Sequence, residues 1–534
     1  MTTKRVIFTG QSGIKIREAI SGFKKMTASF ARGQRSEPLF FPLEDEMLNI
    51  YLTEKQIKYY PRIWVAEIFS LPYSYLQNLW EKAFETILNK IRNSENKDIF
   101  INFHACFYHH DTVEYLSFVR ETLLKKFQPN LFVTLIDDIY DIHTRLRGIN
   151  QIFHTAHGGA SEPTGAILEL FRILDWRSKE IMMTRHFASE LNNVPHYVFA
   201  VKHSYETLYK LIYEDKPTFY ISHPISEVRR LQKKKQRIQA NAIIDEIHRF
   251  QDKISSEFTC FLPTTIDELR IDFENRRKEK VYVRRLMPRW DEEKYKQPIN
   301  LLFIPPSQEV DDDPLWDTHA TRKTKESDLL LNILQNHVDV QVSTRDHKLV
   351  EQSQNLAVYR PCFNGNPSGG VLEEIKYYKK SGKKNCFIYL PKKDQNDLKI
   401  RILEETILEE ITDKRIVSKN KKTVLSAFVL TENEKKKVVL ADDNIDGIMP
   451  LLDEIIGTHK LRVDAGRNGL KPDRTQQAIE IKTTLIDRFI SSFKTAIDVY
   501  KKAATQMREE DDFTPELFVD KIVQFLSNEN NTRR

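Results

Sequence analysis

Short apolar segments alternate with longer amphipathic segments over the first 215 residues, and this alternation constrains the fold more than any other feature of the chain. The apolar segments are RVIFTG (5–10), DIFINFH (98–104), LFVTLID (131–137) and HYVFAVKH (196–203). Between them, residues 73–93 and 113–127 repeat their apolar side chains with the period of a helix. Buried strands that alternate with helices are typical of a doubly wound parallel sheet. We therefore predict an α/β domain over residues 1–215.

The same pattern starts again after residue 217 and predicts a second doubly wound α/β domain over residues 216–395. Its expected strands include 218–226, 299–305, 355–361 and 385–391, with a basic helix at 227–254 and another helix near 326–337. Residues 396–534 are predicted as a third region, mixed α/β at first and then mainly helical over 471–527. A chain of 534 residues is also too long for one ordinary core.

Charge and cysteine content restrict the class of protein. The net charge is only +6, from 82 basic and 76 acidic residues, so the overall charge does not call for a nucleic-acid partner. The basic segment RRLQKKKQR (229–237) is interpreted as the solvated face of a helix. No apolar segment is long enough to cross a membrane, and the four cysteines lack metal-binding spacing. A cytoplasmic protein that binds neither membranes nor nucleic acid is expected.

The segment SGGVLEE (368–374) carries the strongest chemical signal in the second domain. It follows an expected strand (355–361) and opens an expected helix (371–380), at the edge of the sheet where α/β proteins bind ligands. Ser368, Gly369 and Gly370 offer a hydroxyl and backbone N–H groups to an anion. Glu374 lies one helical turn further on, so its carboxylate can point back to the same place. This arrangement suits a phosphate that anchors a sugar on which the acid acts.

This segment resembles the S-x-G-V-x-x-E signature of the nucleoside 2-deoxyribosyltransferase-like superfamily, and especially of its nucleotide N-glycoside hydrolases. The resemblance implies that Glu374 is the nucleophile on the anomeric carbon and that Ser368 holds the 5′-phosphate. It also implies oligomers with pockets near the subunit contacts. The expected reaction cleaves a base–ribose bond through an oxocarbenium-like state, which a carboxylate stabilises or captures without a cofactor.

Two further stretches resemble the same superfamily in the same order. FYISHPIS (219–226) is similar to its first strand and places Tyr220 near the active-site carboxylate. Ser222 and His223 then stand where the family has small residues in its first loop, and they become candidate substrate-binding residues. STRDHKLVEQSQNLAVYRP (343–361) is similar to a segment in which an aspartate, here Asp346, precedes a helix and orients the sugar or handles a proton. The signature loop lacks the aspartate that true transferases usually carry, which favours hydrolysis or nucleotide binding over base exchange.

Some of these acids also have ordinary structural interpretations. Glu373 is expected to be a first-turn acid that interacts with helix N–H groups. Asp346 has a cap as its alternative role, because an aspartate ahead of a helix often only caps it.

The first domain contains a glycine turn, VIFTGQSGIKIREAI (6–20), that resembles a degenerate P-loop. Gly10, Gly13 and Lys15 would contact phosphates, and Ser12 would replace the hydroxyl that binds Mg²⁺. LFVTLIDDIYD (131–141) has the form of a Walker B segment, with Asp137 and Asp138 available for a metal-bound water. The order of strands and helices resembles a nucleoside-monophosphate kinase, so ATP and Mg²⁺ are the candidate ligands. Four arginines are candidate phosphate ligands: Arg145, Arg147, Arg177 and Arg185.

Plainer alternatives exist for both parts of this domain. Gly10 and Gly13 are also what an ordinary strand-to-helix turn requires. His104, His109 and His110 cluster near Cys106, but their spacing matches no zinc site. Polar contacts at strand ends explain them better, and His104 is the one that could face a nucleotide pocket.

Three functions are compatible with these features. The first is a nucleotide N-glycosidase, acting on a nucleotide or NAD, that an attached NTPase-like domain regulates, as in a defence effector. The second is a non-catalytic nucleotide sensor whose C-terminal region relays the bound state to a protein partner. The third is a nucleotide kinase that uses the first domain.

Overall fold

The computed structural model describes residues 3–30, 37–57, 71–92, 96–109, 114–148, 163–225, 228, 237–266, 271–272, 282–283, 297–298, 325–383, 385–413, 430–441, 448–452, 454, 475–510 and 514–532. The chain divides into two compact units. Unit 1 contains residues 1–220 and 258–354, and unit 2 contains residues 221–257 and 355–534. Both units are therefore built from separated stretches of sequence. This division differs from the three consecutive segments predicted, with boundaries at 215 and 395.

Unit 1 is organised around a five-stranded parallel sheet in the order β2-β3-β1-β6-β7. Its strands are β1 (Arg5–Thr9), β2 (Leu39–Pro42), β3 (Ile99–Asn102), β6 (Leu131–Ile136) and β7 (His196–Ala200). All four strands predicted in this region are confirmed. β2 was missed, because its four residues are followed at once by the acidic first turn of a helix.

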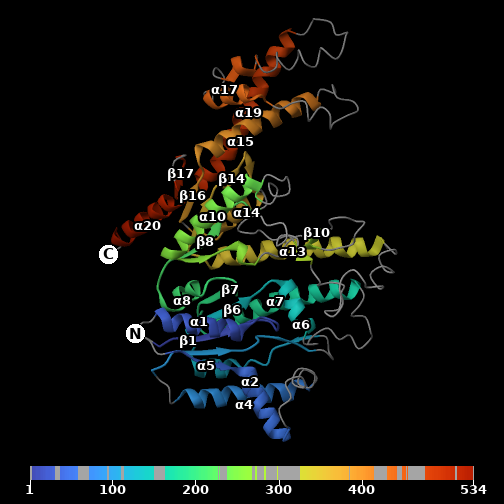
Figure 1. Ribbon diagram of the computed structural model, residues 1–534, viewed down its shortest axis with the longest axis vertical. Helices are drawn as coiled ribbons and strands as arrows, with labels where there is room; N and C mark the ends of the chain where they lie inside the picture. Colours follow the sequence, from blue (N-terminus) through green and yellow to red (C-terminus); the bar gives the residue numbers. More distant parts are fainter. Residues whose placement is uncertain are drawn as a thin grey trace. The chain divides into compact units, whose positions relative to one another are not determined.

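Helices cover both faces of this sheet (Figure 1). α1 (Ile16–Phe30) and α8 (Tyr205–Tyr213) lie on one face, and α2 (Leu43–Lys55), α4 (Tyr73–Ile91) and α5 (Glu121–Phe127) lie on the other. Alternate residues of one strand point to opposite faces, so Ile7 of β1 packs against Trp80 and Phe84 of α4. Phe8 and Phe100 face the other way, where the ring of Phe23 of α1 packs against that of Phe100 in a tilted arrangement, with 5.9 Å between the ring centroids. Apolar side chains on both faces explain why these strands read as continuous apolar segments.

The helix predicted at 113–127 is shorter than expected. β5 (Glu114–Leu116) pairs antiparallel with β4 (Phe107–His109), and α5 begins only at Glu121. Local periodicity could not reveal this, because the partner strand lies upstream.

Unit 1 continues through α6 (Ile139–Gly148) and α7 (Pro163–Glu190) and is completed by α13 (Lys325–Gln352), which packs against α7 and β7. The prediction of a helix near 326–337 is corrected in its length, because one helix extends from Lys325 to Gln352. Gln352 closes the free edge of the sheet: its Oε1 accepts from Val198 N at 2.8 Å and its Nε2 donates to Val198 O at 2.9 Å. An edge strand is thereby covered by a side-chain amide.

The second five-stranded sheet has the order β17-β16-β13-β8-β9. β8 (Thr218–Ser222), in which the boundary between the units falls, pairs in parallel with β9 (Thr259–Phe261). β16 (Cys386–Tyr389) pairs in parallel with β13 (Asn355–Tyr359) and β17 (Gln506–Arg508). The expected strand at 299–305 lies outside the described residues. The chain is therefore an α/β protein with two largely parallel sheets.

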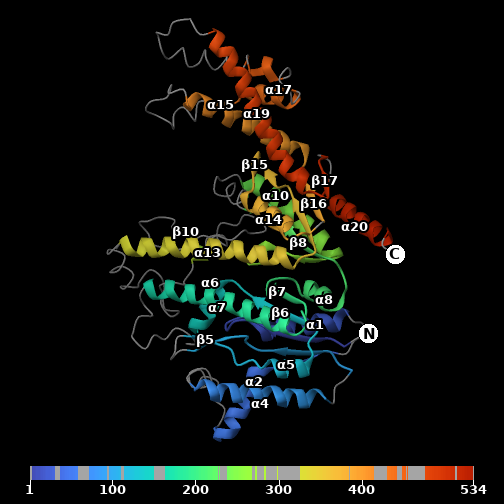
Figure 2. The same ribbon diagram turned by 180° about the vertical axis from the view of Figure 1, so that it is seen from behind.

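Helices of unit 2 pack in pairs. α10 (Arg237–Glu257) packs against α20 (Pro515–Thr532), and α15 (Lys392–Asp413) against α19 (Thr475–Ala503), a pair that can be followed from both sides (Figures 1 and 2). α14 (Gly369–Lys380) follows a small hairpin of β14 (Cys362–Phe363) and β15 (Asn366–Pro367). α17 (Glu432–Leu440) begins with a capping box between Thr431 and Glu434. The mainly helical character predicted for 471–527 is confirmed over the described residues.

Short elements complete the description. They are η1 (Pro263–Thr265), β10 (Ile271–Asp272), β11 (Tyr282–Val283) and β12 (Gln297–Pro298). All four cysteines are free thiols and are buried. Within the part of the chain that the structure describes, no helix combines the length and apolar character needed to cross a membrane.

Candidate functional sites

The glycine turn of unit 1 connects β1 to α1 at the carboxyl end of the sheet. Gly13 has a φ of +84°, and a Cβ built there would lie 3.0 Å from side-chain atoms of Leu146. Both the left-handed backbone and the close approach require glycine at this position. Lys15, which was expected to contact phosphates, is exposed.

A buried carboxylate already occupies part of this turn. Glu180 of α7 accepts a hydrogen bond from Gly10 N at 2.9 Å, from Ala105 N at 2.6 Å and from Cys106 N at 3.0 Å. Burial raises the pKa of Glu180, and the nearby His104 partly offsets this rise. The backbone N–H of Gly10, which a P-loop would offer to phosphate, is therefore bonded to an internal acid.

The predicted Walker B acids lie next to the same turn. Asp137 and Asp138 are fully buried after β6. Asp137 Oδ2 accepts from Arg145 Nη1 at 2.7 Å, and the same nitrogen donates to Gly13 O at 2.9 Å. Lys202 Nζ lies 3.6 Å from Asp137 Oδ1. The structure brings the turn, Arg145 and Asp137 together, and two cations, Arg145 and Lys202, lie beside the Asp137 carboxylate.

Arg147, Arg177 and Arg185 are the other arginines predicted as phosphate ligands. Arg177 is buried, and Arg185 pairs with Glu351 of α13 at 2.8 Å. The side chain of Arg147 lies outside the described residues.

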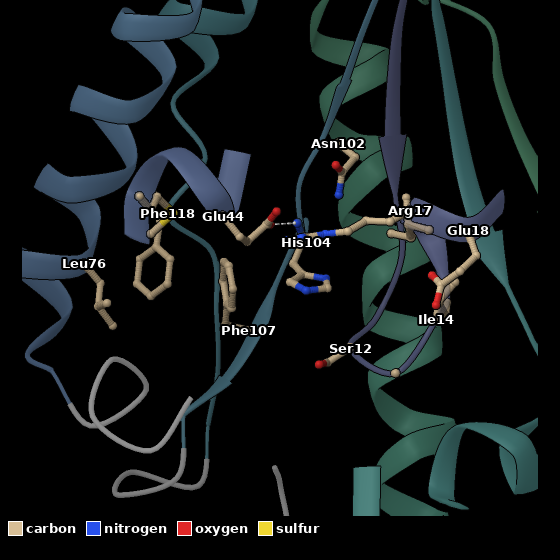
Figure 3. A pocket seen from close by; sticks show the side chains of 13 residues that line it. Ser12, Ile14, Arg17, Glu18, Glu44, Leu76, Asn102, His104, Phe107 and Phe118 are labelled. Atoms are coloured by element: carbon tan, nitrogen blue, oxygen red, sulfur yellow. Dashed lines mark hydrogen bonds between the residues drawn. The ribbon is translucent and has the colours of Figure 1, made fainter. Parts of the chain in front are cut away.

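A cavity of about 230 Å³ opens beside the glycine turn, over the carboxyl ends of β1, β2 and β3. Figure 3 shows its aromatic wall, in which Phe107 lies between Phe118 and the ring of His104. The Phe107 ring is 5.2 Å from that of His104 and 5.1 Å from that of Phe118, centroid to centroid. The cavity is further lined by Ser12, Gly13, Ile14, Ile16, Arg17, Glu18, Glu44, Met47, Leu76 and Asn102. It joins an apolar wall to a polar end, as small-molecule sites commonly do.

The polar end of this cavity is built by three side chains. Glu44, in the first turn of α2, accepts from His104 N at 2.9 Å, and burial raises its pKa while His104 opposes that rise. His104 Nδ1 bonds the carbonyl of Gly10, so in the neutral ring Nδ1 carries the hydrogen and Nε2 is an acceptor. Asn102 is 6% exposed, and its Oδ1 has no hydrogen-bond partner among the described residues. This end therefore offers acceptors to a ligand.

Sequence reasoning identified His104 here but missed Glu44 and Asn102. An asparagine at the end of a predicted strand was a usable signal for Asn102. Glu44 could not be recognised, because the strand that precedes it, β2, was not predicted from the sequence.

In unit 2, the predicted nucleophile lies at the start of α14. Ser368 is the N-cap residue and its side chain forms no cap hydrogen bond, while Ser368 N donates to Pro361 O at 2.9 Å. Gly369 and Gly370 are exposed, and a Cβ on either would meet no atom within 4 Å. The backbone therefore does not require these glycines, but they keep the N-terminus of α14 open.

Glu374 is partly buried and contacts one of the other predicted residues. Its Oε2 accepts from Ser222 Oγ at 2.5 Å, and Ser222 is fully buried at the end of β8. His223 is also buried, with its Nε2 3.0 Å from Gln251 Nε2 of α10. Glu373 is exposed and pairs with Lys376 at 2.8 Å, which makes it a surface acid. The structure thus brings Glu374 and Ser222 together. Glu373 and Glu374 are neighbours in the sequence, but Glu373 is exposed and Glu374 is partly buried.

Tyr220 and Asp346 belong to unit 1, whereas Glu374, Ser222, His223 and Ser368 belong to unit 2. Tyr220 is a fully buried residue of β8. Asp346 lies inside α13, where its Oδ1 accepts from Arg345 Nε at 3.0 Å and Nη2 at 2.8 Å. The expectation that Asp346 precedes a helix, and with it the cap interpretation, is wrong.

Neither a scan against protein-family models nor a search of curated proteins finds a match to this chain. Among the described residues, no group of three or more His, Cys, Asp or Glu side chains could hold a metal ion. Cys106 donates its thiol to Glu180 Oε2 at 3.3 Å, and His109 Nε2 lies 3.3 Å from Leu71 O. These residues make the strand-end polar contacts expected of them, while His110 lies outside the described residues.

Proposed function

We propose that this chain is a nucleotide N-glycosidase in which Glu374 attacks the sugar. The observation that carries the proposal is the position of Glu374: a partly buried carboxylate, one turn inside an open helix N-terminus, bonded at 2.5 Å to the Ser222 hydroxyl. The N-terminus of α14 favours an anion, which suits the 5′-phosphate of a nucleotide.

The reaction follows from these groups. The Glu374 carboxylate forms a bond to C1′ of the ribose as the C1′–N bond breaks, and the bonding pair leaves on the base nitrogen, which takes a proton from water. Water then attacks C1′, releases Glu374 and gives the free sugar phosphate. The hydrogen bond from Ser222 Oγ fixes the orientation of the Glu374 carboxylate. Ser368 and the N–H groups of residues 369 and 370 would hold the phosphate.

The decisive experiment measures base release by chromatography from nucleoside monophosphates, deoxynucleoside monophosphates and NAD. Glu374→Gln is expected to lower the rate by at least 10³-fold, because an amide cannot act as the nucleophile. Glu373→Gln is the matched control, and it should leave the rate unchanged because Glu373 is exposed and pairs with Lys376 on the surface of α14. Ser222→Ala should retain part of the activity. Base release that survives Glu374→Gln would refute the assignment.

The cavity of unit 1 favours a second candidate function, the nucleotide sensor. Its support is the buried Asn102 Oδ1, which has no protein partner among the described residues and lines a cavity with an aromatic wall. Adenosine, AMP and ATP should be compared in a thermal-shift assay on wild type, Asn102→Leu and Glu374→Gln. Binding that requires Asn102 but not Glu374, without base release, would favour the sensor over the enzyme. A kinase has less support, because Gly10 N–H and Asp137 are both engaged by other protein groups.

A further inference from the structure

Unit 1 has a second cavity, of about 360 Å³, at the opposite edge of its sheet. It lies at the amino end of β7, between the C-terminal parts of α7 and α13, whereas the first cavity lies over the carboxyl ends of β1, β2 and β3. No residue lines both cavities. The polar side chains that matter here are Arg185, Ser189, Asn193, His196, Lys348 and Glu351.

Lys348 is the distinctive residue of this cavity. Its side chain is half-buried and, among the described residues, it forms no hydrogen bond or ion pair. Burial lowers the pKa of Lys348, the nearby Arg185 lowers it further, and Glu351 only partly compensates. A lysine whose charged form is disfavoured in this way gains stability when an anion approaches it.

The groups around Lys348 leave a surplus of positive charge. Arg185 pairs with Glu351 at 2.8 Å, but both side chains are more than a third exposed, so this pair contributes little and can open. His196 bonds Thr134 Oγ1 at 2.8 Å through Nε2, and burial lowers its pKa to about 4, which leaves it neutral at pH 7. The two cations thus face a single carboxylate.

Neutral hydrogen-bonding groups complete the cavity. Ser189 and Asn193 lie at the end of α7, where Asn193 has a left-handed backbone with a φ of +56°. Their side-chain oxygens are 3.4 Å apart, so both are directed to the same region of the wall. Hydroxyl and amide groups beside two cations are a common environment for an oxyanion.

We propose that this cavity is a binding site for an oxyanion, a phosphate or carboxylate group of a small ligand, with Lys348 and Arg185 as its charged contacts. The site is independent of the glycosidase proposal, since it uses no residue of unit 2. An anion bound here would contact α7, β7 and α13 together, and it would stabilise the packing of α13 on unit 1.

The first experiment is calorimetric titration of the full chain with inorganic pyrophosphate and, separately, with citrate, at constant ionic strength. Lys348→Met should weaken binding of the preferred anion at least tenfold. Lys125→Met, which removes an exposed cation on α5, should leave it unchanged. Preference for pyrophosphate or for citrate identifies the source of the oxyanion. Equal loss of binding in both variants, or no binding of either anion by wild type, would overturn the proposal.

The second experiment locates the anion without relying on a variant. A lysine with a lowered pKa reacts faster with acetic anhydride near pH 8, and mass spectrometry of peptides measures the labelling of each lysine. Saturating anion should slow the labelling of Lys348 severalfold and leave Lys125 unaffected. Binding detected by calorimetry without protection of Lys348 would place the anion elsewhere and refute the site.

Discussion

Glu180 and Glu44 sit beside the same glycine turn, and together they change what the turn can bind. Glu180 takes the N–H of Gly10, and Glu44 takes the main-chain N–H of His104. The candidate ligand-binding part of this region is therefore the acceptor-rich cavity rather than the donor-rich turn. Sequence reasoning found the turn from its glycines. It could not find Glu180, which lies 170 residues away in a helix of ordinary composition.

Glu180→Gln tests how much this carboxylate holds the region together. An amide turns one acceptor into a donor that faces backbone N–H groups, so a loss of about 2 kcal/mol or more is expected in the free energy of unfolding. Urea unfolding followed by tryptophan fluorescence measures it, because all five tryptophans fall in the residue ranges of unit 1. Glu190→Gln, an exposed acid on the same helix, is the control. Equal stability of both variants would contradict the structural role of Glu180.

His203 gives unit 1 a specific sensitivity to acid. The ring is fully buried between Phe199 and Phe261, its Nε2 has no partner among the described residues, and burial lowers its pKa to about 3. In the unfolded chain the pKa of this histidine is near 6.5, so between pH 6.5 and pH 3 the unfolded chain binds more protons than the folded one. The free energy of unfolding therefore decreases as pH falls from 6.5 towards 3. At pH 5 the loss is about 2 kcal/mol.

His203→Phe should remove this loss, because a phenyl ring fits among the same aromatic side chains and does not titrate. Urea unfolding at pH 7 and pH 5 is the measurement. Between pH 7 and pH 5 the free energy of unfolding of wild type should decrease by about 2 kcal/mol more than that of the variant. The same pH dependence in both proteins would assign the acid sensitivity to other groups.

At the level of elements, the strands of unit 1 were predictable and the extent of α13 was not. Strands buried on both faces leave continuous apolar segments, which sequence shows directly. Within α13, the segment VDVQVSTRDH shows little of the apolar periodicity that marks a helix. Contacts with α7 and β7, which are distant in the sequence, hold this segment as part of α13. For the same reason Asp346 was expected ahead of a helix and lies within one. In unit 2, the sequence placed Glu374 and Ser222 in the same candidate site, and the structure brings them into contact. The hydrogen bond between them could not be read from the sequence.

Gln352→Leu should destabilise unit 1 and expose the edge of β7. The variant loses two hydrogen bonds to Val198, worth about 1 kcal/mol each, and leaves backbone groups of an edge strand unpaired. Differential scanning fluorimetry combined with light scattering should show a lower melting temperature and earlier aggregation. Asn336→Leu, at an exposed position of the same helix, controls for added apolar surface. If both variants aggregate alike, the amide of Gln352 does not protect the edge.

At the level of the whole molecule, the two units are interleaved in sequence. Unit 1 takes α13 from beyond α10, which belongs to unit 2. Composition and strand–helix order suggested consecutive domains, because nothing in a local pattern records which unit a later helix joins. The boundary predicted at 215 would consequently remove a helix that covers the edge of the first sheet.

A fragment of residues 1–215 should therefore be much less soluble than a fragment of residues 1–354, which retains α13. Expression of both, followed by centrifugation and circular dichroism, measures the difference. The shorter fragment is expected to precipitate through its uncovered β7 edge. A soluble and fully folded 1–215 fragment would show that α13 is dispensable for unit 1.

Interleaving also sets an order of events during protein synthesis. The ribosome must translate residue 354 before unit 1 has all its parts, and by then α10 has already emerged. α10 must then wait for α20 (Pro515–Thr532), its packing partner. The nascent polypeptide consequently carries an amphipathic helix without its packing partner until residue 532 has been translated, which gives a chaperone an interval in which to engage it.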